Sequence, residues 1–340
     1  MTDTDCPILD ALAGRPPRRR PAWFMRQAGR CLPEYRELRK KHSFLELLRD
    51  PDVGTEVTLM PMRRFDLDAA ILFTDLLVPL EAMGIPLEYK PGPELGWTVD
   101  SRETLSQLRP FDPGDALAVP LETARRVRAQ LPPGKALLGF VGAPWTLAAY
   151  LVEGKGSKSW TKLRSLAWGD APLFAAILDK LVEAALAFGL ALARAGCDAV
   201  QVFDSWAGVA EPHQFARVVG PAVQKLVAGL RESGIPVIYF VNGAEPHLDM
   251  MANTGADCLG LDWRIDIARA HAALPTNLAV QGNLDPAALF APADTIGEEV
   301  RRIVGSVPQR PYIFNVGHGL DPNTPIAGIE AALSALRALD

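Results

Sequence analysis

The stretch that decides the fold runs from "ALLGFVG" (136–142) through "APLFAAILDKLVEAALAFGLALARAG" (171–196) to "AVQVF" (199–203). The two short runs are apolar and hardly alternate with polar residues, which is typical of strands buried on both faces. The long segment between them has the length of a helix, and it ends in a glycine, as helices often do. Strand, helix and strand in this order predict a unit of a parallel α/β sheet.

The same alternation extends along the chain in both directions. The candidate strands are "AWFM" (22–25), "AAILF" (69–73), "ALLGFVG" (136–142), "AVQVF" (199–203), "PVIYFV" (236–241), "DCLGLDW" (257–263), "NLAVQGN" (277–283) and "YIFNVG" (312–317). Helical patterns such as "PHQFARVVGPAVQKLVAGLRESG" (212–234) separate them. Eight strand–helix repeats predict an α/β fold, a (β/α)₈ TIM barrel that forms one catalytic domain over residues 21–340. The alternative is a doubly wound open sheet, but no GxGxxG or Walker loop follows the first strand.

Two segments fall outside the barrel repeat. Residues 1–20 are predicted to form an N-terminal arm, because "GRPPRRRP" is basic and rich in proline; we expect an extended arm that is a candidate for disorder. The acidic N-terminus has no basic n-region, so it does not have the pattern of a secretory signal. "PLEYKPGPELGWTVDS" (86–101) predicts a β-hairpin inserted after the second strand.

Composition narrows the classes of protein. The chain has 340 residues, 49% hydrophobic content and a formal net charge of -5, which argues against a nucleic-acid-binding protein. No uncharged apolar stretch reaches the ~18 residues of a membrane helix. The cysteines are far apart and form no CxxC pair, so no disulfide framework or zinc knuckle is expected, and a reduced, cytoplasmic setting fits. They are Cys6, Cys31, Cys197 and Cys258.

Polar residues follow the candidate strands at their C-terminal ends, where barrel enzymes carry their chemistry. Because these ends surround one mouth of a barrel, we expect a single shared site. The residues are Arg26, Gln27, Arg30, Thr74, Asp75, Trp145, Thr146, Tyr150, Asp204, Ser205, Asn242, Asp262, Asn283 and His318.

Arginines dominate the segment "FMRQAGRCLPEYR" (24–36). Arg26 and Arg30 share a face if the turn is helical; if it is a loop, the glycine between them lets both point inward. Guanidinium groups stay charged and bind carboxylates with two hydrogen bonds, so the pair predicts a ligand with several carboxylates or a phosphate. For Arg36 and Arg39 taken alone, salt bridges on a solvated helix face are the favoured interpretation, although Arg39 could also face the mouth of the barrel.

The other candidates have a structural and a functional interpretation. Asp75 could cap a following helix or pair with an arginine, or it could accept hydrogen bonds from ligand N–H groups and stabilise positive charge. His318 stands between glycines, which favours a ligand contact. Tyr150 and Ser205 are weak candidates alone, because hydroxyls at strand ends often bond to backbone. Asp204 could pair with Arg26 or Arg30 rather than touch a ligand.

Several common chemistries lack their motifs. HExxH, HxH and HxC do not occur, so a zinc hydrolase or zinc methyltransferase lacks obvious ligands. The GxSxG elbow of a hydrolase is missing, and no lysine ends a strand where a Schiff-base barrel would need one.

Six ordered segments resemble the signature segments of the uroporphyrinogen decarboxylase family. They are "WFMRQAGRCLPEYRELR", "RRFDLDAAILFTDLLVPLEAMG", "GFVGAPWTLAAYLVEG", "QVFDSWAG", "QGNLDP" and "FNVGHGLDPNTP". They span residues 22 to 325, which is nearly the whole chain, and the arginine motif together with "FTD" is highly specific.

The resemblance implies a single-domain barrel that forms a homodimer. It also implies conversion of uroporphyrinogen III to coproporphyrinogen III by decarboxylation of four acetate side chains, without a metal or an organic cofactor. Asp75, Arg26 and Arg30 are then the expected catalytic residues. The family's binding positions fall on Arg26, Gln27, Ala28, Gly29, Arg30, Asp75, Tyr150, Ser205 and His318.

Some positions depart from the family pattern. Cys31 follows the arginine motif where tyrosine is usual, Trp206 stands where a polar residue is common, and Ser205 replaces a frequent threonine. Two other functions remain open. A corrinoid-dependent zinc methyltransferase on the same barrel would need a His-x-Cys stretch where this chain has "YFVNGAE" (239–245). A tetrapyrrole-binding protein without activity would have no reason to keep both Asp75 and the arginines.

Overall fold

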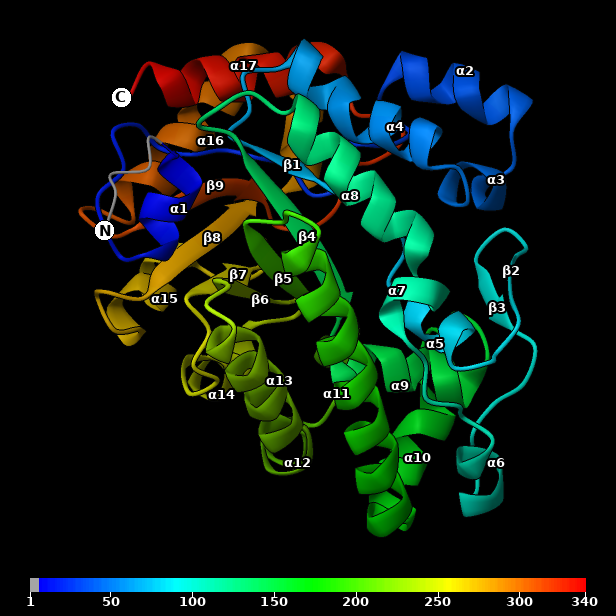
Figure 1. Cartoon of the computed structure of the whole chain (residues 1–340). Coiled ribbons are helices and arrows are strands. Elements are labelled where there is room, and N and C mark those ends of the chain that lie inside the picture. The colour runs from blue at the N-terminus through cyan, green and yellow to red at the C-terminus, as the bar shows by residue number, and fades with distance from the viewer. Residues whose placement is uncertain (1–5) are drawn as a thin grey trace.

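The computed structural model describes residues 6–340 and shows seven parallel strands that curl into a barrel-like sheet surrounded by helices (Figure 1). The strands, in the order in which they lie side by side, are β1 (Ala69–Ile71), β4 (Ala136–Gly142), β5 (Ala199–Asp204), β6 (Val237–Val241), β7 (Cys258–Leu261), β8 (Ala279–Leu284) and β9 (Tyr312–Val316). Every residue of these strands is buried, as apolar runs without alternation predict. The predicted α/β TIM-barrel fold in a single domain is confirmed.

The first predicted strand is wrong as a regular strand, although its segment fills the gap between β9 and β1. Ala22 forms a single parallel bridge with Phe314, and its carbonyl accepts a hydrogen bond from the Asp68 N–H at 2.8 Å. A longer ladder does not form because Pro21 has no N–H to donate, and because the Ala22 N–H bonds to the Asp68 carboxylate instead of a backbone carbonyl.

Helices cover the outside of the sheet. They are α1 (Pro7–Leu12), α2 (Pro33–Lys41), α3 (Phe44–Leu48), α4 (Pro51–Arg64), α5 (Val78–Ala82), α6 (Arg102–Ser106), α7 (Pro113–Ala116), α8 (Ala118–Gln130), α9 (Pro144–Glu153), α10 (Thr161–Gly169), α11 (Ala171–Arg194), α12 (Pro212–Gln214), α13 (Gly220–Glu232), α14 (Leu248–Ala252), α15 (Ile267–Ala273), α16 (Ala293–Gly305) and α17 (Ile326–Arg337). The helix predicted within 171–196 is α11. The Asp170 side chain caps it by accepting from the Leu173 N–H at 2.9 Å.

The hairpin prediction is confirmed, and the arm prediction needs correction. Strands β2 (Leu87–Tyr89) and β3 (Pro93–Leu95) pair in antiparallel fashion. Residues 7–12, expected to be extended, form α1 because "PILDAL" begins with a proline that suits a helix start and places Ile8, Ala11 and Leu12 in the core. Residues 13–20 form neither helix nor strand, and residues 1–5 lie outside the described part of the chain.

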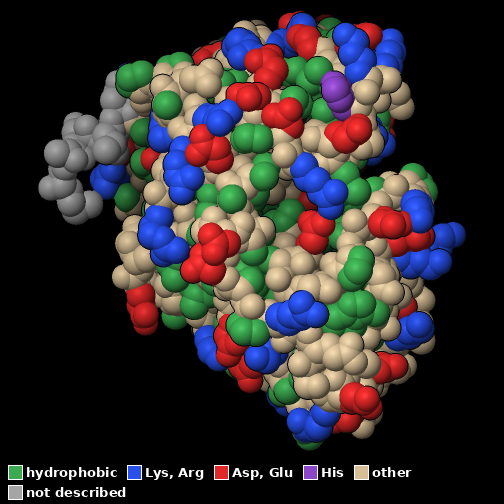
Figure 2. All heavy atoms as spheres, turned by 45° about the vertical axis from the view of Figure 1, so that its right-hand side comes forward, with side chains coloured by type: hydrophobic (Ala, Val, Ile, Leu, Met, Phe, Trp, Pro, Cys, Tyr) green, Lys and Arg blue, Asp and Glu red, His purple; other side chains and the backbone are tan. Residues whose placement is uncertain are grey.

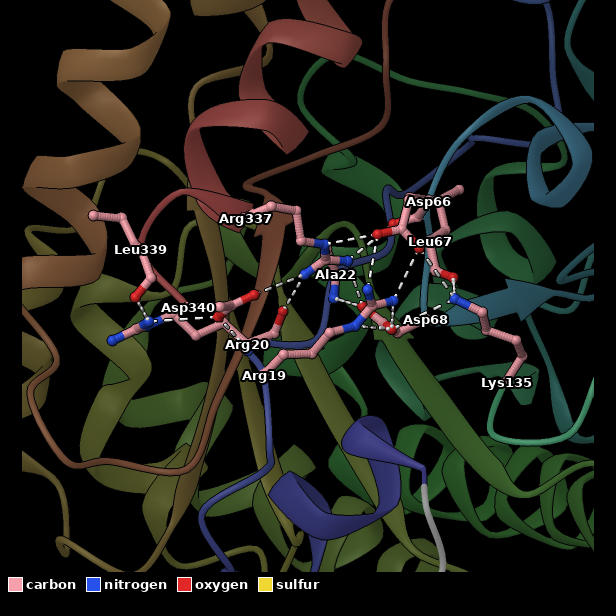
Figure 3. A network of polar contacts seen from close by, with 10 residues as sticks. All are labelled: Arg19, Arg20, Ala22, Asp66, Leu67, Asp68, Lys135, Arg337, Leu339 and Asp340. Atoms are coloured by element: carbon pink, nitrogen blue, oxygen red, sulfur yellow. Dashed lines mark hydrogen bonds and ion pairs between the residues drawn. The ribbon is translucent and has the colours of Figure 1, made fainter.

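A network of ion pairs closes the end of the barrel at which the strands begin (Figure 3). Asp68 lies just before β1 and is 1% exposed. Its carboxylate binds Arg19 from the N-terminal arm and Arg337 from the last helix, at 2.5 and 2.7 Å. Lys135, just before β4, approaches Asp68 at 3.7 Å. The network thus joins the two ends of the chain to the first strand. Within residues 6–340, no helix combines the length and apolar character that a membrane span requires.

Candidate active site

A cavity of about 640 Å³ opens at the ends where the strands finish, as expected for a barrel. Figure 2 shows a hollow on this side of the molecule with Lys and Arg side chains beside it. The predicted site residues that line the cavity are Arg26, Ala28, Gly29, Arg30, Thr74, Asp75, Ser205 and His318. Gln27 and Tyr150 are not among the lining residues. The structure therefore brings together most of the positions expected from sequence, from segments far apart in the chain.

The cationic side of the cavity is built on a strained turn. Arg26 has φ +65°, a left-handed conformation that costs a non-glycine residue of order 1–3 kcal/mol. Its side chain packs across Gly319, where no Cβ would fit. Burial, with Arg30 nearby, lowers the pKa of Arg26, while Tyr150 and Asp75 raise it. Within residues 6–340, neither Arg26 nor Arg30 has a carboxylate partner at salt-bridge distance. Both cations line the cavity, where the carboxylates of a ligand could pair with them.

Arg36 and Arg39 behave differently from each other. Arg36 donates to the backbone carbonyls of Arg30 at 3.1 Å and Cys31 at 3.3 Å, so it supports the loop. Arg39 lines the cavity, donates to the His42 carbonyl at 2.6 Å and lies 5.9 Å from the centre of the Phe44 ring. Within residues 6–340, neither arginine forms the expected salt bridge to an acidic residue. Arg39 faces the mouth of the barrel and adds a third arginine to the lining of the cavity.

Asp75 is half-buried in an apolar stretch of the chain, between Phe73 and Leu76. Its Oδ1 accepts a hydrogen bond from the Leu77 N–H at 2.8 Å, which caps the turn that leads into α5. Burial raises the pKa of Asp75, and the Leu77 N–H, Tyr89 and Arg26 oppose this rise. The carboxylate also lines the cavity, so the capping and the cavity-facing interpretations both hold.

Tyr89 is a site residue that sequence reasoning missed. It comes from the hairpin strand β2 and lines the cavity, and its pKa is raised by burial and by the Asp75 carboxylate. Its buried hydroxyl makes no hydrogen bond of ordinary geometry within residues 6–340, but it lies close enough to the Asp75 carboxylate to lower the pKa of Asp75. The signal in the sequence was weak: alternation in the hairpin places Tyr89 on the same face as the buried Leu87, but nothing local shows that this face meets the barrel mouth.

The predicted hydroxyl residues lie at different depths. Ser205 lines the cavity, and its carbonyl accepts from the Asn242 side chain at 3.0 Å. Tyr150 lies behind the wall, where its ring meets Trp160 and Trp206 edge-on, at 5.3 and 6.3 Å between centres. Burial raises the pKa of Tyr150.

Asp204 does not pair with an arginine, so that expectation is wrong. It is fully buried at the end of β5, and it accepts hydrogen bonds from the hydroxyls of Thr146 at 2.7 Å and Tyr239 at 3.0 Å. With only neutral donors around it, burial raises the pKa of Asp204 to about 7. Its contacts join the start of α9 to β5 and β6.

His318 is held as a neutral ring. Its ring lies 6.0 Å from Trp263 and 6.4 Å from Phe240, measured between centres. Burial, together with Arg26 and Arg264, lowers the pKa of His318 to about 4. At neutral pH the side chain therefore offers one donor and one acceptor and adds no charge.

This histidine gives a prediction about stability. Its pKa falls from an ordinary value of about 6.5 in the unfolded chain to about 4 in the fold. The stabilisation from neutral His318 is present above pH 6.5 and is lost as the pH falls toward 4, because only the unfolded chain takes up the proton. His318→Asn should remove this dependence. As the pH falls, the unfolding free energy of the wild type should therefore decrease more than that of the variant. Urea unfolding at pH 7 and pH 4.5 measures it, and a gap that does not move with pH would contradict it.

The cysteines do not suit a zinc site. Burial raises the pKa of the Cys197 thiol, and burial together with Asp257 raises that of Cys258. Within residues 6–340, no three His, Cys, Asp or Glu side chains lie close enough together to hold a metal ion.

The arrangement selects for a particular kind of ligand. Among residues 6–340, the cavity is lined by the rings of Phe140 and Phe203, by three arginines and by a single carboxylate, the half-buried Asp75. A large ring with an apolar face, carboxylates at its edge and N–H donors at its centre would match all three features.

Comparison with known proteins agrees with this geometry. The sequence model "Uroporphyrinogen decarboxylase (URO-D)" matches residues 3–339. Among curated relatives, uroporphyrinogen decarboxylase from Geobacter metallireducens is 43% identical over 319 residues and covers 94% of each chain. The protein of that name from Syntrophotalea carbinolica is 43% identical over 326 residues, covering 96% of this chain and 95% of its own.

Solved structures share the fold at low sequence identity. A methyltransferase from Methanosarcina mazei superposes with a TM-score of 0.81 at 20% identity and covers 98% of each chain. A B12-independent methionine synthase from Shewanella reaches a TM-score of 0.56 at 13% identity, covering 84% of this chain and 86% of its own. These likenesses concern the fold alone, whereas the full-length match and the identity to curated relatives show that this chain belongs to the uroporphyrinogen decarboxylase family.

Proposed function

We propose that the protein decarboxylates the four acetate side chains of uroporphyrinogen III to methyl groups, giving coproporphyrinogen III and carbon dioxide, without a metal or an organic cofactor. The observation that carries this proposal is one cavity that is lined by three arginines and, within residues 6–340, by a single half-buried carboxylate. Arg26, Arg30 and Arg39 suit a substrate with eight carboxylates, and Asp75 suits its converging pyrrole N–H groups. Family membership supports the same reaction.

The chemistry needs an electron sink, and the substrate supplies one. A proton adds to a pyrrole carbon beside the acetate-bearing carbon and makes the ring cationic. The bond between the acetate methylene and its carboxylate then breaks, its electron pair flows into the ring, and carbon dioxide leaves. The resulting exocyclic methylene takes up a proton to become a methyl group, and the ring carbon returns its proton. Each decarboxylation thus consumes one proton and releases one carbon dioxide, and the four acetates together consume four protons.

The cavity residues take distinct roles in this scheme. Asp75 accepts from the pyrrole N–H groups and stabilises the cationic ring, in a site that excludes water and so strengthens the attraction. Arg26 and Arg30 clamp substrate carboxylates and fix the ring over Asp75. Ser205 and neutral His318, which line the cavity, orient the substrate by hydrogen bonding, and Tyr150 supports the wall from behind. Removal of the acetate carboxylates weakens the clamp step by step, which favours product release.

Binding measurements test the substrate class separately from turnover. Quenching of tryptophan fluorescence should show tighter binding of uroporphyrin I, with eight carboxylates, than of coproporphyrin I, with four. Added salt should reduce the difference in affinity between the two porphyrins, because screening weakens the contacts between arginines and carboxylates. Equal affinity for both porphyrins would argue against a carboxylate clamp, and tight binding without turnover would favour a binding protein.

Assembly and setting follow from the family in this proposal. The active form is a homodimer, which light scattering after gel filtration would detect as twice the mass of the chain. A reducing, cytoplasmic setting is supported by Cys6, Cys31, Cys197 and Cys258, which are all free and buried.

A further inference from the structure

The side chain of Gln27 points away from the cavity whose wall its neighbours form. It is 1% exposed and makes two hydrogen bonds to backbone. Its Oε1 accepts from the Phe24 N–H at 2.8 Å, and its Nε2 donates to the Ala69 carbonyl at 2.9 Å. The Gln27 N–H itself donates to the Phe24 carbonyl at 2.9 Å and closes the turn that carries Arg26.

We infer that Gln27 is a positioning residue, which fixes the Arg26 turn against β1 and does not contact the substrate. The inference rests on the proposed function. Ala69 is the first residue of β1, and Asp75 follows the end of the same strand. Gln27 therefore sets the distance between the arginine clamp and the carboxylate that faces it.

The opposite side of the turn has its own anchors. The Met25 N–H donates to the Asn315 side chain at 3.0 Å, and the Leu320 N–H donates to the Met25 carbonyl at 2.9 Å. Arg26 also packs across Gly319. These bonds tie the turn to β9 whether or not Gln27 is present. Loss of Gln27 should therefore let the turn shift relative to β1 and Asp75, without detaching it from the barrel.

The left-handed backbone makes the turn depend on such bonds. A residue such as Arg26 stays at positive φ only where its surroundings fix it. Without the Gln27 side chain, the Phe24 N–H loses the acceptor that holds one end of the turn. A relaxed turn would move the guanidinium, and misplacement of a substrate-positioning group by about 1 Å can cost 10²-fold in rate.

Gln27→Met tests the inference, because methionine fills the same space and forms neither hydrogen bond. We expect kcat/KM for reduced uroporphyrinogen to fall by about 10- to 100-fold. Gln281→Met is the matched control: Gln281 is buried in β8, accepts from the Trp23 indole at 2.8 Å and donates to Gln201 at 3.3 Å, away from the cavity. The control should lower the melting temperature to a similar extent and keep kcat/KM within about threefold. Equal losses of activity in both variants would overturn the inference.

A double-mutant cycle separates positioning from direct contact. In an Arg26→Ala background, Gln27→Met should cause no further loss beyond about twofold, because Gln27 acts through Arg26. Independent, multiplying losses would mean that Gln27 touches the substrate, and would overturn the inference. If Gln27→Met does not fold, Gln27→Glu keeps the acceptor for Phe24 and loses the donor to Ala69, and the same cycle applies to it.

The design keeps failure of the inference apart from failure of the proposed function. The cycle is measured both on turnover and on binding of uroporphyrin I. If wild-type protein does not decarboxylate the reduced substrate, the proposed function fails, and the binding cycle still decides the role of Gln27. If wild type turns over and the two changes multiply, only the inference about Gln27 fails.

Discussion

Asp75→Asn is expected to lower kcat by about 10²- to 10³-fold, the usual cost of removing a preorganised group that stabilises charge in the transition state. The amide keeps the shape of the side chain and removes its negative charge, so the cationic ring loses its partner in a water-excluded site. The binding of uroporphyrin I should weaken much less than turnover, because the arginine clamp remains. Single-turnover decarboxylation and fluorescence titration measure the two effects separately.

The pH profile adds a second readout for the same variant. Burial raises the pKa of Asp75 above its ordinary value, so wild-type activity should fall as the pH drops and the carboxylate takes up a proton. Asp75→Asn should lose this acidic limb, because asparagine does not titrate. Full activity of Asp75→Asn, or an unchanged acidic limb, would contradict the role given to Asp75.

Asp68→Ala is expected to destabilise the fold by about 3–5 kcal/mol, the cost of breaking a buried ion pair from one side. Asp68 is 1% exposed and binds Arg19 at 2.5 Å, Arg337 at 2.7 Å and the Ala22 N–H at 2.9 Å. All three partners lie where the ends of the chain meet the first strand (Figure 3). Alanine would leave the buried Ala22 N–H without its acceptor, and Arg19 and Arg337 would keep their exposed partner, Asp66. Urea unfolding at pH 7 should register this loss.

Asp66→Ala is the matched control. Asp66 bonds to the same arginines, at 2.8 Å from Arg19 and 3.0 Å from Arg337, but its side chain is 53% exposed. Water can replace the carboxylate there, so we expect a loss within about 1 kcal/mol. Similar losses in the two variants would mean that burial of Asp68 does not decide the stability of the barrel closure.

The fold could be predicted where local pattern and global structure agree. The run at 199–203 is apolar, β-branched and followed by turn residues, and it is β5 almost residue for residue. The prediction of a regular strand at 22–25 is wrong because the Ala22 N–H bonds to the carboxylate of Asp68, which is distant in sequence. No local pattern reveals this bond. The helix at 7–12 was not predicted, because the basic, proline-rich stretch that follows it led us to expect an extended conformation for the whole arm.

The site could be predicted where residues directly follow strands. Asp75, Ser205 and His318 all reach the cavity for that reason. Tyr89 and Arg39 were missed or undervalued, because they come from the inserted hairpin and from a helix that fold over the mouth through contacts distant in sequence.

Within the arginine motif, sequence could not tell which side chains face inward. That choice depends on the left-handed backbone at Arg26, which points Arg26 toward the cavity and turns Gln27 toward β1. Asp204 shows the same limit: it ends a strand as Asp75 nearly does, but its partners are hydroxyls beneath the cavity.

The most direct measurement is an anaerobic incubation of reduced uroporphyrinogen III with purified protein that has been treated with a chelator and given no cofactor. Products are then oxidised and separated by their number of carboxylates. We predict successive appearance of species with seven, six, five and four carboxylates, with one carbon dioxide released per carboxylate lost. Substrate that keeps all eight carboxylates, in the presence of folded protein that binds it, would contradict the proposed reaction.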